Sequence, residues 1–66
     1  MKLYFENRHG KRTEIATVQN AEEAIEEIVH FCDIHKFKIH YYRTWEVGNS
    51  TTFDVGSHTE FFHLEN

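Results

Sequence analysis

The chain has 66 residues, of which 39% are hydrophobic, 27% are charged and 15% are aromatic, and its formal net charge is −4. This is the size of one domain spanning residues 1–66. It is too apolar for a disordered chain, and it has no apolar run near the roughly 20 residues of a membrane span. The lone cysteine, Cys32, excludes an internal disulfide framework, so we expect a protein of the reducing cytoplasm with no membrane partner.

The N-terminal part predicts a β-hairpin. Residues 2–8 alternate between apolar and polar positions, as a half-buried strand does. Residues 12–18 are rich in β-branched side chains and predict a second strand. The polar segment 7–11 contains a glycine and predicts the loop between them.

The next segment predicts one amphipathic helix. Asn20 is a favourable N-cap, and Glu23 three residues later completes a pattern similar to a capping box. The basic pair His35–Lys36 suits the negative end of the helix dipole and predicts the end of the helix. Apolar residues at helical spacing form one stripe that should face the core: Ala21, Ala24, Ile25, Ile28, Phe31 and Cys32, with His35 at its end.

The C-terminal half predicts further strands. Residues 37–47 alternate along their whole length and predict one long strand. A turn at 48–50 leads to a strand at 51–55, and residues 60–64 suit a last short strand. The core-facing side chains of the long strand are predicted to be Phe37, Ile39, Tyr41 and Trp45.

This order of elements predicts an α+β domain with two layers. The expected architecture is an antiparallel sheet of four to five strands, in the order ββαββ with a fifth strand after it, and one helix packed on one face. The other face of such a sheet is open to solvent or to a partner. Ten aromatic residues suit the core of a chain this short.

Charge is distributed unevenly along the chain. The helix segment from Ala21 to Asp33 contains acids and no lysine or arginine. A solvated helix surface accounts for this pattern, but carboxylates spaced along a helix can also imitate phosphates and occupy a nucleic-acid-binding groove. The candidate partner-binding residues on the helix are Glu22, Glu23, Glu26 and Glu27.

No pattern of catalytic or metal-binding residues is present. His58, Glu60 and His63 are the group most similar to a zinc site, but alternation on a strand would point His63 away from the other two. There is no HExxH, CxxC or glycine-rich phosphate loop, and Cys32 on the apolar stripe is expected to be inert. We therefore predict no enzyme, no metal and no cofactor.

The open face of the sheet is the second candidate surface. Tyr4, His40 and Tyr42 are predicted to share it with Lys2 and Lys38. Aromatic and basic side chains on an open sheet can stack on single-stranded nucleic acid, although no RNP motif is present. The same residue types are also enriched in protein interfaces.

Residues 45–47 and 53–62, Trp-Glu-Val followed by Phe-Asp-Val-Gly-Ser-His-Thr-Glu-Phe-Phe, resemble a segment of short uncharacterised phage and prophage proteins of Gram-positive bacteria. The opening Leu3-Tyr4-Phe5 and the glutamate-rich helix are similar in style. The resemblance implies a phage accessory protein in the bacterial host cytoplasm that binds a host or phage protein, in some cases to inhibit it.

Two functional hypotheses follow from the sequence. The leading one is a non-enzymatic interaction protein that binds a protein partner through the acidic helix face or the open sheet face. The alternative is a module that binds single-stranded nucleic acid through the aromatic and basic residues of the open sheet face. The acidic net charge favours the first, and self-association through the sheet edge or face, giving a homodimer, stays open.

Overall fold

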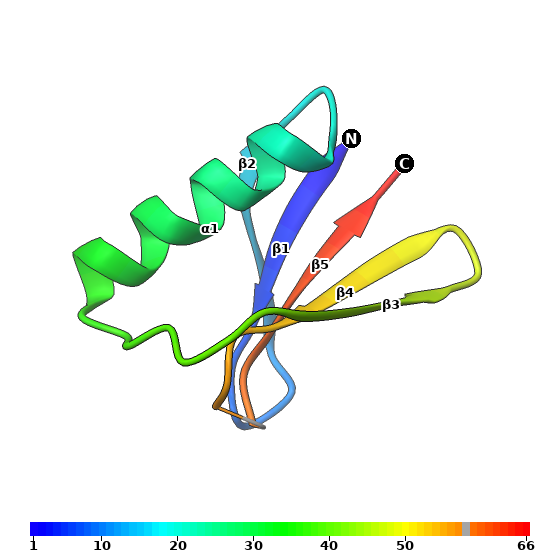
Figure 1. Ribbon diagram of the computed structural model, residues 1–66. Coiled ribbons are helices and arrows are strands. Elements are labelled where there is room, and N and C mark those ends of the chain that lie inside the picture. Colours follow the sequence, from blue (N-terminus) through cyan, green and yellow to red (C-terminus); the bar gives the residue numbers. More distant parts are fainter. Residues whose placement is uncertain (58) are drawn as a thin grey trace.

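The computed structural model describes residues 1–57 and 59–66. It confirms the predicted α+β fold with two layers, in which one helix packs on one face of a five-stranded antiparallel sheet (Figure 1). The elements in chain order are β1 (Lys2–Glu6), β2 (Arg12–Thr17), α1 (Ala21–His35), β3 (Arg43–Val47), β4 (Ser50–Asp54) and β5 (Phe61–Glu65).

The sheet brings the first and last strands together. Its order is β2-β1-β5-β4-β3, so β1 lies between its hairpin partner β2 and the C-terminal strand β5. Lys2 pairs with Glu65 at one end of the β1–β5 ladder, and Glu6 pairs with Phe61 at the other. This register fixes which side chains of the two halves of the chain lie next to each other on each face.

The core lies between the sheet and α1. Alternation places Leu3 of β1 and Phe62 of β5 on the helix side, where each is at most 1% exposed. The ring of Phe62 lies 5.3 Å from that of Phe5 and 5.5 Å from that of Phe31, between centroids. The buried apolar residues are Leu3, Val18, Ala24, Ile28, Cys32, Phe53, Val55, Phe62 and Leu64.

The ends of α1 follow the sequence prediction. The side chain of Asn20 accepts a hydrogen bond from the backbone N–H of Glu23 (2.9 Å), and the Glu23 carboxylate accepts one from the N–H of Gln19 (3.3 Å). The helix ends where Lys36 adopts a left-handed conformation (φ 58°), and its N–H bonds back to the last turn. Both ends of α1 are therefore capped.

Replacing Asn20 with alanine should destabilise the domain by about 1 kcal/mol, because the N–H of Glu23 loses its acceptor. In thermal unfolding followed by circular dichroism, this corresponds to a fall in Tm of roughly 4–8 °C for a domain of this size. Gln19→Ala is the matched control, since only the backbone of Gln19 takes part in the cap. Equal Tm values for the two variants would contradict the capping role.

The predicted strand over residues 37–47 is wrong in its first half. Only Arg43–Val47 forms a strand, and residues 37–42 connect α1 to β3 at the far edge of the sheet. Their alternation arises because Phe37 packs on the rings of Phe5 and Phe31, at 5.8 and 6.1 Å, and Ile39 packs on the core. The alternation of residues 37–42 therefore comes from a connecting segment that packs on the core without pairing in the sheet.

The prediction that Tyr41 and Trp45 belong to the core is also wrong. Trp45 is 38% exposed and Tyr41 is 39% exposed. Trp45 pairs with Thr52, and the helix-facing residue of β4 is the next one, Phe53. Opposite residues in a ladder share a face, so Trp45 lies on the face away from α1. The alternation of this strand was correct, but its assignment to a face was inverted.

Asp54 at the end of β4 is fully buried, which its position beside a turn did not indicate. Its carboxylate accepts hydrogen bonds from the guanidinium of Arg43 (3.0 Å) and from the N–H of Gly56 (2.9 Å). Gly56 has φ +112°, and a Cβ there would lie 2.7 Å from the Cβ of His40. Glycine is thus required where the α1–β3 connection crosses the end of β4.

Candidate functional site

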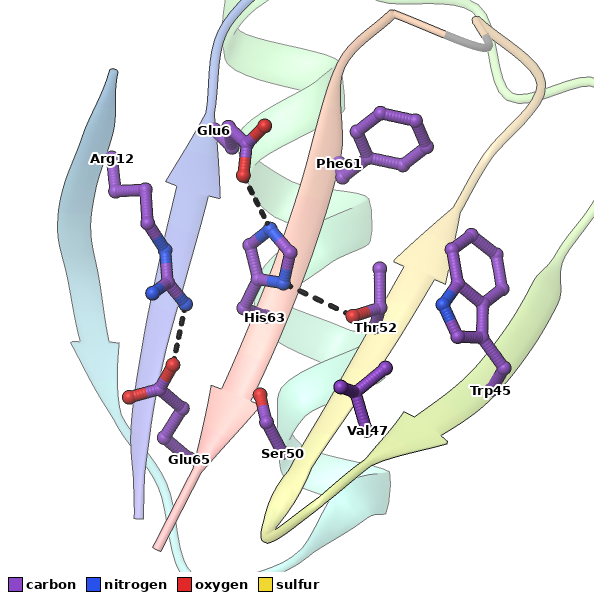
Figure 2. Close-up of a pocket in the computed structure, with 9 residues that line it drawn as sticks. All are labelled: Glu6, Arg12, Trp45, Val47, Ser50, Thr52, Phe61, His63 and Glu65. Atoms are coloured by element: carbon purple, nitrogen blue, oxygen red, sulfur yellow. Dashed lines mark hydrogen bonds and ion pairs between the residues drawn. The ribbon is translucent and has the colours of Figure 1, made fainter. Parts of the chain in front are cut away.

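The candidate site is a groove on the open sheet face, the face away from α1. Its side chains come from all five strands. Figure 2 shows them on the sheet, with the helix behind it. The groove has a volume of about 480 Å³. We call it the open-face groove, and it is lined by Glu6, Arg12, Trp45, Val47, Ser50, Thr52, Phe61, His63 and Glu65.

One side of the open-face groove is apolar. The rings of Trp45 and Phe61 lie 6.1 Å apart in an edge-to-face arrangement (76°), and Val47 follows Trp45 on the same face of β3. Val47 is 62% exposed. Exposed apolar side chains gathered in one groove are unusual on a domain this small and are typical of contact surfaces.

The floor of the groove is a hydrogen-bonded row across three strands, formed by Glu6, His63 and Thr52 (the His63 row; Figure 2). His63 Nε2 lies 2.8 Å from Glu6 Oε1, and Nδ1 lies 3.1 Å from Thr52 Oγ1. Because the carboxylate can only accept, Nε2 donates. In the neutral ring, Nδ1 then accepts from the Thr52 hydroxyl.

The order hydroxyl, imidazole and carboxylate is also the order of a nucleophilic relay. Thr52, however, is only 5% exposed, and it lies in the middle of β4 between two paired strands. Its backbone N–H therefore belongs to the sheet ladder and not to a turn that could bind an oxyanion. The arrangement can orient His63 and fix the polar floor of the groove.

Charged side chains around the groove are paired with one another. The guanidinium of Arg12 bonds the carboxylate of Glu65 and lies 4.9 Å from the centre of the Tyr4 ring. On the opposite edge, Arg43 bonds Asp54 and lies 5.4 Å from the Trp45 ring. Each arginine thus combines a carboxylate and an aromatic face, which holds both ring and cation in place.

The structure places the predicted residues of the open sheet face in two locations. Tyr4 and Lys2 lie on this face, where Lys2 forms an ion pair with Glu14 (3.6 Å). His40 and Tyr42 lie in the α1–β3 connection, so they are not part of the sheet. Tyr42 is 45% exposed, and partial burial together with the electrostatic interaction with Cys32 raises the pKa of its hydroxyl.

The predicted acidic residues lie on α1, on the opposite side of the sheet from the groove. Glu22, Glu26 and Glu27 are exposed, whereas Glu23 is half-buried and engaged in the N-cap. The helix face and the open-face groove are therefore two separate surfaces. The structure does not join the predicted partner-binding residues into one site.

Sequence reasoning missed most of the groove. Phe61 and His63 alternate with the buried Phe62 and Leu64, so the sequence did contain the signal for one of its strands. The contribution of Trp45 was missed because this residue was assigned to the core. The His63 row depends on the β1–β5–β4 register, which no local pattern encodes.

The predicted zinc-like group is only partly described. His58 lies outside the described residues, and Glu60 precedes β5, whereas His63 is bound in the His63 row. Within residues 1–57 and 59–66, no three histidine, cysteine or acidic side chains gather as a metal site would require. Cys32 is free and 1% exposed, as its place on the apolar stripe predicted, and burial raises the pKa of its thiol.

Comparisons with protein-family models, with curated proteins and with solved structures found no match. In the part of the chain that the structure describes, no helix combines the length and apolar character needed to cross a membrane.

Proposed function

We propose that this chain is a non-enzymatic interaction protein that binds a protein partner through the open-face groove. The observation that supports this proposal is the ring pair of exposed Trp45 and half-buried Phe61, inside a groove whose charged residues are already paired with one another. Such a surface offers apolar area at its centre and a polar rim, which is the usual anatomy of a protein interface.

The aromatic centre would supply most of the binding energy. Tryptophan is enriched among the residues whose loss weakens protein complexes most, and it acts best where surrounding contacts exclude water. Arg43 stacks near Trp45, and Phe61 packs against its edge, so the ring needs little further ordering when a partner binds. A partner with an aliphatic or aromatic side chain flanked by polar groups would fit this surface.

The alternative, a binder of single-stranded nucleic acid, has less support. Bases could stack on Trp45 and Phe61, but the neighbouring cations Lys2, Arg12 and Arg43 are each paired with a carboxylate. Phosphates would have to displace these carboxylates, which would also repel them. A protein partner is the better match for this interleaved charge.

The cellular setting belongs to the same proposal. The resemblance to short phage and prophage proteins, together with a lone cysteine, supports a partner in the cytoplasm of a bacterial host. The resemblance implies that such binding inhibits the partner in some cases. The acidic face of α1, formed by Glu22, Glu26 and Glu27, would then serve mainly as the solvated side of the helix.

The proposal can be tested by quantitative capture from a bacterial lysate with three forms of the protein. The double variant Trp45→Ala, Phe61→Ala should capture at least about tenfold less partner than the unchanged protein, because both rings of the groove are removed. A helix variant with Glu22, Glu26 and Glu27 changed to glutamine is the matched control and should capture as much as the unchanged protein. The capture should survive nuclease treatment.

Three outcomes would count against the proposal. Loss of capture in the helix variant alone would assign binding to the acidic face. Loss on nuclease treatment would favour the nucleic-acid alternative. A salt-sensitive change in the fluorescence of Trp45, the lone tryptophan, on titration with single-stranded oligothymidylate would favour it as well.

A further inference from the structure

The two edges of the sheet differ in how they are protected. β2, at one edge, carries Arg12 and Glu14 on the open face, and it contains a bulge at Ile15, where the pairing with β1 shifts by one residue. Charges and bulges are the usual devices that prevent an edge strand from pairing with another chain. The bulge is the feature that sets the β2 edge apart and protects it from pairing with another chain.

β3, at the other edge, also carries one arginine and one glutamate, Arg43 and Glu46, but it has no bulge. All five of its residues are exposed, its register with β4 is regular, and it contains no lysine and no proline. Within the described residues it pairs with β4 alone. Three of its five residues, Thr44, Trp45 and Val47, are of types that are enriched in paired strands, and Trp45 and Val47 share one face.

The β3–β4 turn determines which backbone groups of β3 point outward. Val47 pairs with Ser50 across a two-residue turn in which Gly48 has φ 61°, so Val47 and Ser50 form a hydrogen-bonded pair. Because bonded and non-bonded pairs alternate along an antiparallel ladder, the N–H and C=O groups of Thr44 and Glu46 point away from β4. Four backbone groups are thus presented at this edge.

We infer that β3 pairs with β3 of a second copy of this chain, antiparallel and centred on Trp45, to form a continuous ten-stranded sheet. In this register, Thr44 lies opposite Glu46 of the second copy, so the four outward groups of each copy are satisfied. Trp45 lies opposite Trp45 of the second copy at a non-bonded position, where opposing side chains are closest. Arg43 lies opposite Val47 of the second copy.

Charge selects this register among the symmetric ones. A pairing centred on Glu46 would place two carboxylates directly opposite each other, which is unfavourable. A pairing centred on Thr44 would use only residues 43–45 of each strand and leave Val47 without a partner. The register centred on Trp45 uses all five residues and places no like charges opposite each other.

The inference predicts a dimer with twice the monomer mass of 7.9 kDa in sedimentation equilibrium. A strand pair of this length forms a small interface, so the dimer should dissociate on dilution to about micromolar concentration. Thr44→Pro removes an outward N–H from each copy without touching the β3–β4 ladder, and should weaken the dimer roughly tenfold to a hundredfold. Thr44→Val keeps that N–H and should leave the dimer intact.

A cross-linking experiment tests the register without depending on stability. Trp45→Cys places the new thiols at a non-bonded pair, about 4.5 Å apart between Cα atoms, which is within disulfide range. It should form a disulfide-linked dimer under mild oxidation. Val47→Cys is the matched control and should not, because it lies opposite Arg43 of the second copy. The buried Cys32 should remain unreactive in both.

Several results would overturn the inference. A monomer at every concentration up to about 1 mM would do so, since even transient dimers are populated there. A dimer unchanged by Thr44→Pro would place the contact elsewhere. Equal cross-linking of the two cysteine variants, or none in a dimeric Trp45→Cys, would contradict the register.

Discussion

Replacing Phe62 with alanine is expected to leave a large fraction of the protein unfolded at 25 °C. Phe62 is 1% exposed and contacts the rings of Phe5 and Phe31, so its removal leaves a cavity at the centre of the core. Such substitutions cost about 3–5 kcal/mol, whereas a domain of 66 residues has a total stability of roughly 3–10 kcal/mol. Urea unfolding followed by circular dichroism measures the loss.

The neighbouring residue provides the control. Phe61 has the same side chain on the same strand, but it faces the open-face groove. Phe61→Ala should therefore cost less than about 1 kcal/mol, close to the range of surface substitutions. If the two variants lost similar stability, the assignment of the two faces of β5 would be wrong, and with it the position of the groove.

Replacing Asp54 with alanine should cost about 3 kcal/mol. The N–H of Gly56 and the guanidinium of Arg43 would both lose the carboxylate that accepts their hydrogen bonds. Because the Asp54 side chain is fully buried, water does not readily replace it. Thermal unfolding should show a fall in Tm of roughly 10 °C or more. Asp54→Asn keeps an oxygen that can accept from Gly56 and should lose less.

An exposed ion pair serves as the control for charge alone. Glu65→Ala breaks the ion pair between Glu65 (36% exposed) and Arg12 (40% exposed). It should lower the free energy of unfolding by less than about 1 kcal/mol. A similar loss for Glu65→Ala and Asp54→Ala would indicate that ion pairing, and not the buried turn contact, determines the effect.

The fold could be predicted because its local patterns agree with its packing. Asn20 and Glu23 identified the start of α1. Ala24, Ile28 and Cys32 of the predicted apolar stripe form its buried side, whereas Ala21, Ile25 and His35 of the same stripe are exposed. The strands of the first hairpin end one or two residues earlier than predicted, and the last two strands are shifted by one residue. Periodicity identifies such elements well, but it defines their ends poorly.

The errors share one physical cause. Alternation specifies which residues of a strand lie together, but not which face they occupy, and it cannot distinguish a paired strand from a segment lying on the core. Residues 37–42 and Trp45 illustrate the two cases. The face that a residue occupies, and whether a segment pairs at all, depend on contacts with strands that are distant in the sequence.

The candidate site was even less accessible to sequence reasoning. Glu6 and His63 are separated by 57 positions, and Thr52 joins them only through the β4–β5 register. Neither the spacing nor the residue types of these three positions form a recognised motif. The open face itself was predicted, and Tyr4 was correctly placed on it, but the residues that form its groove could be identified only from the strand order.

The position of β1 between β2 and β5 also has a consequence for how the chain folds. The N-terminal hairpin and α1 can form early, because their contacts are close in sequence. The main ladder that ties them to β4 and β3 runs through β5, so the sheet cannot close until residues 61–65 have been synthesised. Until then, the edge of β1 that contains Leu3 and Phe5 has no partner strand on the β5 side. Removal of residues 61–65 should therefore destabilise the fold far more than removal of an unpaired terminal segment would.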